Sequence, residues 1–128
     1  MKKLLLVLVI AVASLSANDT MRESMHKMEM GLDKIQKGYL YNNKTLISEG
    51  LDEVYEGNKL FKKVDMAKYL PQNKQHMLKR ALGHSESIDK SQAAMKNAVL
   101  QSKYYDAIEY QGEIVKACAA CHGVVRSW

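Results

Sequence analysis

The chain of 128 residues carries 19 lysines and arginines against 14 aspartates and glutamates, a formal net charge of +5. This mild excess argues against nucleic acid as a partner, because nucleic-acid-binding proteins concentrate basic residues on one face. The length is enough for one domain with one hydrophobic core, and no linker or internal repeat indicates a second domain.

The N-terminus has the layout of a secretory signal peptide. Two lysines precede an apolar run of about a dozen residues, and small residues follow up to Ala17. The run is shorter than the ~20 residues that a membrane span needs, which disfavours an uncleaved anchor. We expect residues 1–17 to be removed on export, with cleavage after Ser16 as a close alternative. Residues 18–128 would then form a periplasmic domain, not inserted in a membrane, with 17 basic and 14 acidic residues.

Four later stretches repeat apolar residues every three or four positions, the period of an amphipathic helix. Strand-like alternation is absent, and Pro71 indicates the start of the third helix, because proline fits the first helical turn. Gly50 and Gly57 either weaken the second helix or let another element approach it closely. The predicted inward residues are Met21, Met25, Met28, Leu32, Ile35 and Tyr39; Ile47, Leu51, Val54, Asn58 and Phe61; Met77, Ala81, His84, Ile88, Ser91, Met95 and Ala98 or Val99; and Tyr104, Ala107 or Ile108, Gln111, Ile114 or Val115, Cys118, Cys121 or His122, and Val125. Such helices with mostly short joints predict an all-α, antiparallel up-down four-helix bundle.

The two cysteines of the chain, Cys118 and Cys121, are followed directly by His122. A disulfide within C-x-x-C closes too small a loop to restrain the unfolded chain much. A thioredoxin-like redox pair belongs to a βαβ context, and a zinc site needs a second ligand pair; neither accompanies this motif. C-x-x-C-H is the attachment sequence of haem c. On a helix both sulfurs can reach the vinyl groups of one porphyrin while the imidazole binds its iron. We predict one covalent haem c near the C-terminal end of the fourth helix.

Several features surround this motif near the end of the last predicted helix. A Gly-Glu pair precedes the cysteines at 112–113, Arg126 follows the histidine by four residues, and a Lys-Gly pair at 37–38 closes the first helix. In these features the chain resembles the class II c-type cytochromes, which include cytochrome c′ and its low-spin relatives. Val125 departs from the aromatic residue usual in that family. The resemblance implies a haem protein that carries electrons or binds gases, with Arg126 near a haem propionate or the proximal imidazole.

The second axial position of the iron separates these two activities. His122 lies 20 residues beyond Ser102, about 30 Å along a helix. Counted back from Gly38, Met21 and Met25 lie 17 and 13 residues away, roughly 26 and 20 Å. Met21 is therefore predicted to bind the iron opposite His122, with Met25 as the alternative. If both methionines only fill the core, the iron is five-coordinate and binds nitric oxide or carbon monoxide, as cytochrome c′ does.

The remaining histidines admit other interpretations. Met25 and His26 carry soft ligands suited to Cu(I). Neighbours on a helix, however, point about 100° apart, so His26 is expected at the surface. His84 is predicted on the inward face, either as a partly buried histidine bonded to a neighbour or as a group facing the haem. His76 could also reach the haem edge.

The predicted partners are redox proteins, because a Met/His-ligated haem suits one-electron transfer. The basic pairs at 62–63 and 79–80 are expected to be solvated, or to steer an acidic partner. The resemblance also implies pairing of two copies through the first two helices. No set of nucleophile, base and acid stands out, so no enzymatic activity is predicted.

Overall fold

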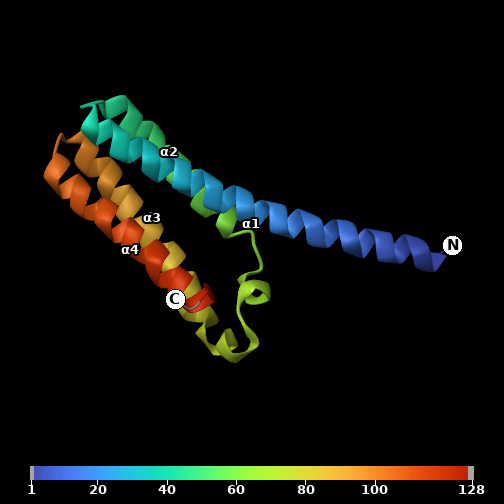
Figure 1. Cartoon of the computed structure of the whole chain (residues 1–128). Helices are drawn as coiled ribbons and strands as arrows, with labels where there is room; N and C mark the ends of the chain where they lie inside the picture. Colours follow the sequence, from blue (N-terminus) through green and yellow to red (C-terminus); the bar gives the residue numbers. More distant parts are fainter. Residues whose placement is uncertain (1, 127–128) are drawn as a thin grey trace.

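The computed structural model describes the backbone of residues 2–126 and the side chains of residues 19–126 (Figure 1). Over this range the chain forms the helices α1 (Lys2–Leu40), α2 (Lys44–Phe61), α3 (Leu78–Leu100) and α4 (Tyr104–Arg126), with two short 3₁₀ helices, η1 (Met66–Tyr69) and η2 (Gln72–Met77). No strand occurs among the described residues, so the predicted all-α fold with four packed helices is confirmed.

Of the predicted signal peptide, residues 1–17, the described backbone from residue 2 onward forms the N-terminal part of α1 (Figure 1). Its side chains lie outside the described residues, and its removal stays a prediction. Among the residues with described side chains, no helix is both long enough and apolar enough to span a bilayer. Met21 of α1 packs against an apolar cluster of the core.

Two matching turns make the bundle from two helical hairpins. Residues 41–43 join α1 to α2, and residues 101–103 join α3 to α4. The middle residue of each turn, Asn42 or Ser102, has a positive φ of 51° or 59°. The next amide donates to the carbonyl five residues earlier, at 2.8 Å in the first turn and 2.9 Å in the second. One residue in the left-handed backbone conformation thus ends the helix, and the next helix runs antiparallel to it.

Small residues let α1 and α2 pack very closely. Gly31 on α1 faces Gly50 on α2, so that a Cβ on Gly50 would lie 2.5 Å from the Gly31 carbonyl oxygen. Further along, Ser24 Oγ donates to the carbonyl of Gly57 at 2.8 Å in the buried interface. Gly50 and Gly57 thus lie within an intact helix. They let another helix approach α2 closely, which is one of the two roles predicted for them.

The hydrophobic core is built from all four helices. The predicted inward face of α2 is confirmed, since all five of its residues are buried. On α3 the predicted Ala81, Ile88, Met95 and Ala98 or Val99 are buried, but Ser85 and Gln92 are buried where His84 and Ser91 were expected. Hydrogen bonds to α2 explain the difference, because Gln92 Nε2 donates to the Leu51 carbonyl at 3.2 Å and Ser85 likewise bonds to α2. The core residues are Met28, Ile35, Ile47, Leu51, Val54, Ile88, Met95, Ala98, Val99, Ala107, Ile114 and Ala117.

The hairpins lie close together at their turns and diverge toward the other end of the bundle (Figure 1). The connection between α2 and α3 crosses this open end. Pro71 does not begin the third α-helix directly, since η2 intervenes and α3 begins at Leu78. The Gln75 side chain donates to the carbonyls of Ala67 at 2.9 Å and Leu70 at 2.8 Å, which ties the connection to itself. A second apolar cluster of Phe61, Met66, Leu70, Ala81 and Val124 packs the connection against the end of α4.

Candidate cofactor site between the hairpins

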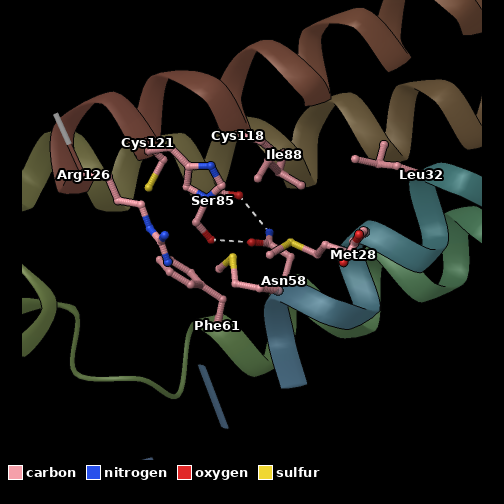
Figure 2. Close-up of a pocket in the computed structure, with 12 residues that line it drawn as sticks. Met28, Leu32, Asn58, Phe61, Ser85, Ile88, Cys118, Cys121 and Arg126 are labelled. Atoms are coloured by element: carbon pink, nitrogen blue, oxygen red, sulfur yellow. Dashed lines mark hydrogen bonds between the residues drawn. The ribbon is translucent and has the colours of Figure 1, made fainter. Parts of the chain in front are cut away.

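A cavity of about 530 Å³ lies between the two hairpins at their open end (Figure 2). This volume is within the range of about 300–1,000 Å³ that is typical of pockets for small molecules and cofactors. All four helices contribute to the wall. The lining residues are Met25, Met28, Glu29, Leu32, Asn58, Phe61, Ser85, Ile88, Cys118, Cys121, His122 and Arg126.

The C-x-x-C-H motif lies in the last two turns of α4. Cys118, Cys121 and His122 are all partly buried and all line the cavity. Both cysteines are free thiols. Burial raises the pKa of each thiol, and the charge of the neighbouring Cys121 thiolate raises that of Cys118 further. The thiols are therefore protonated near neutral pH and need activation before they react as nucleophiles.

The opposite wall comes mainly from α1 and α2. Met28 is buried, at 6% exposure, and Met25 is partly buried; both line the cavity together with Phe61. Met21 is not part of the wall and packs instead against the apolar cluster at the end of the bundle. The structure thus brings Met25, and not Met21, to the same cavity as the motif.

A buried polar network forms part of the wall where α2 meets α3 (Figure 2). Asn58 is fully buried, and its amide donates to the Ser85 carbonyl at 2.9 Å and to Asp89 Oδ1 at 2.7 Å. Ser85 Oγ donates back to Asn58 Oδ1 at 2.8 Å. Asp89 also pairs with Lys62 at the surface. The network joins the hairpins at a fixed register, because each buried polar group has a partner.

The sequence pattern missed Ser85 as a lining residue. Its spacing from Ala81, four residues earlier, fits the buried face equally well, but a serine carries no apolar signal. Met28 was predicted to face the core, but it was not predicted to line the cofactor site. Arg126, at the end of α4, lies at the rim of the cavity as an exposed side chain (Figure 2).

The remaining histidines lie away from the cavity. His26 is exposed, with Nδ1 3.8 Å from Glu29 Oε2, as expected for a surface residue. His84 is partly buried and lines a separate, smaller cavity between η2, α3 and α4, together with Lys74 and Arg80. His76 is exposed in η2. In the part of the chain that the structure describes, no three His, Cys, Asp or Glu side chains converge to hold a metal ion by themselves.

The fold and the site together define a helical bundle with one large apolar cavity into which a C-x-x-C-H motif faces. Comparisons with protein-family models, with curated proteins and with solved structures find no match for this chain.

Proposed function

We propose that the protein is a periplasmic monohaem c-type cytochrome that carries one electron between partner proteins. The observation that carries this proposal is the convergence of two free thiols and an imidazole from one helix on a large apolar cavity. Cys118 and Cys121 would hold the porphyrin as thioethers, and His122 would bind its iron. The haem supplies a one-electron couple between ferric and ferrous iron.

The residues of the cavity fit such a group. Most of the surface that lines the cavity is apolar, with Leu32, Phe61 and Ile88 beside the methionines, which suits the faces of a porphyrin. Arg126 stands at the rim, where a guanidinium can pair with a haem carboxylate. A methionine thioether on the opposite wall would supply a second protein ligand to the iron. We propose Met25 as this ligand ahead of Met21, because Met25 lines the cavity. The helix lengths had favoured Met21.

The alternative is a five-coordinate haem protein that binds nitric oxide or carbon monoxide. The observation in its favour is that Leu32, Phe61 and Ile88, which carry no donor atom for iron, line the cavity beside the methionines. An apolar distal pocket leaves room for a diatomic ligand without offering the iron a competing donor. The two functions share the covalent attachment and differ in the sixth ligand.

The test is to express the full chain in a host that exports proteins and attaches haem c. The purified protein should be coloured, keep its haem after denaturation, and have the mass of the polypeptide plus one haem. The double variant Cys118→Ser/Cys121→Ser should lose the covalent haem. His76→Ala, on the exposed face of η2, is the matched control and should keep it. Colourless wild-type protein with the mass of the bare polypeptide would overturn the proposal.

A further inference from the structure

Positive charge is concentrated in one segment of the chain. Residues 59–80, here called the basic segment, contain seven lysines and arginines and one acidic residue, Asp65. The rest of the described side chains, residues 19–58 and 81–126, hold ten basic and thirteen acidic residues and are therefore net negative. The mild overall charge of the protein thus conceals a strongly basic part.

Most of these charges face solvent. All of the basic side chains in the segment are exposed except that of Lys74, which is partly buried. Lys62 pairs with Asp89, and two further lysines have acidic neighbours only at 3.8 Å. Lys63, Lys79 and Arg80 have no ion pair among the described residues. These three side chains therefore carry positive charge that no described acidic residue neutralises within ion-pair distance.

The basic segment lies beside the mouth of the cavity. Its apolar residues Met66 and Leu70 pack inward against Val124 of α4, which leaves the charged residues on the outside. Lys74 Nζ donates to the carbonyl of Gly123 at 3.4 Å, immediately after the C-x-x-C-H motif. The last charge of α4, Arg126, adds to the same end of the bundle. Figure 1 shows this connection, in green to yellow-green, at the open end of the hairpins.

We propose that the basic segment is the docking surface for an acidic redox protein. This inference rests on the proposed function and names the kind of partner that function requires. A basic surface beside the cofactor steers an acidic protein to the end where electron transfer is shortest, and it releases that protein readily because exposed charges are screened by salt.

The same surface is less suited to a lipid membrane. Stable insertion at an interface needs exposed aromatic or large aliphatic residues beside the basic ones. Within the described part of the chain, none of the exposed large hydrophobic residues lies in the basic segment. Several of them lie at the opposite end of the bundle, in or next to the two hairpin turns: Leu40, Tyr41, Leu100 and Tyr105.

The experiment titrates the exported full-length protein, labelled with ¹⁵N, with a polyglutamate peptide at low ionic strength. Amide shifts should be confined to residues 59–80 and the end of α4. Lys63→Glu/Arg80→Glu should weaken binding about tenfold. The control Lys44→Glu/Lys103→Glu makes the same change in net charge at the other end of the molecule, and it should bind almost as the wild type does.

Equal weakening in the two variants, or shifts spread over the whole surface, would overturn the docking surface. Tighter binding to phosphatidylglycerol vesicles or to a DNA oligonucleotide than to the peptide would overturn the choice of partner. The haem content of every sample is measured by its absorbance. Colourless protein whose basic segment still binds the peptide would contradict the proposed function and the redox character of the partner, but not the acidic docking surface. Haem-containing protein that binds no peptide would contradict only this inference.

Discussion

The close approach of α1 and α2 makes a sharp prediction about glycine. A Cβ on Gly50 would lie 2.5 Å from the carbonyl oxygen of Gly31 and 2.9 Å from the amide nitrogen of Ile35. Both atoms are backbone and cannot rotate away, so Gly50→Ala has to move the two helices apart. A Cβ on Gly83, on α3, would meet no atom of another element within 4 Å, so Gly83→Ala serves as the matched control.

The size of the effect follows from two opposing contributions. Alanine favours a helix over glycine by about 0.8–1.0 kcal/mol at either position. Overpacking costs about 1–3 kcal/mol, with the upper end expected against rigid backbone. Separation of the helices also strains the buried bond from Ser24 to Gly57, which contributes about 1 kcal/mol. Gly50→Ala should therefore destabilise the protein by about 2–3 kcal/mol, whereas Gly83→Ala should stabilise it by up to about 1 kcal/mol.

Urea unfolding of the full-length protein, followed by far-UV circular dichroism, measures both free energies. The melting temperature should change in the same directions, by roughly 4 °C per kcal/mol for a domain of this size. If Gly50→Ala proves as stable as Gly83→Ala, the two helices do not cross at Gly31 and Gly50, and the account of the hairpin is wrong.

Three further predictions test other parts of the molecule. Asn58→Ala should lower the free energy of unfolding by about 2–4 kcal/mol in urea, since it leaves the buried Ser85 hydroxyl without its acceptor and opens a cavity; a loss below about 0.5 kcal/mol would contradict the network. Met25→Leu should convert the reduced haem spectrum from low-spin to high-spin and allow carbon monoxide to bind, whereas Met21→Leu should leave the spectrum unchanged; the opposite pattern would restore Met21 as the ligand. Burial, with a smaller contribution from a neighbouring tyrosine, raises the pKa of Tyr39 from its ordinary value of 10.0 to about 12, and its buried hydroxyl has no hydrogen-bond partner among the described residues. The unfolded chain therefore releases this proton first, and the wild type should lose stability between pH 10 and about 12; Tyr39→Phe should remove that part of the loss, and identical pH profiles for the two proteins would contradict the burial.

The helices could be predicted from the sequence because each one buries one face. Apolar residues on that face recur every three or four positions along the chain. The α2 stripe from Ile47 to Phe61 is the clearest case, since every predicted residue is buried. On α3 the same reasoning placed His84 and Ser91 inward, and it missed Ser85 and Gln92. Buried polar residues give no hydrophobic signal, and their burial depends on acceptors that α2 supplies across the interface.

The sequence alone determined the parts of this protein that depend on near neighbours in the chain. The helical periods, the short joints and the spacing of Cys118, Cys121 and His122 are local, so that backbone geometry suffices to predict them. The tertiary structure decided which distant groups meet. The glycines of α1 and α2 set how closely those helices pack. The packing of the four helices places Met25 on the cavity wall, whereas Met21 packs against the apolar cluster at the end of the bundle. The basic segment could be counted in the sequence, but its place beside the cavity follows from the packing of Met66 and Leu70 against the end of α4.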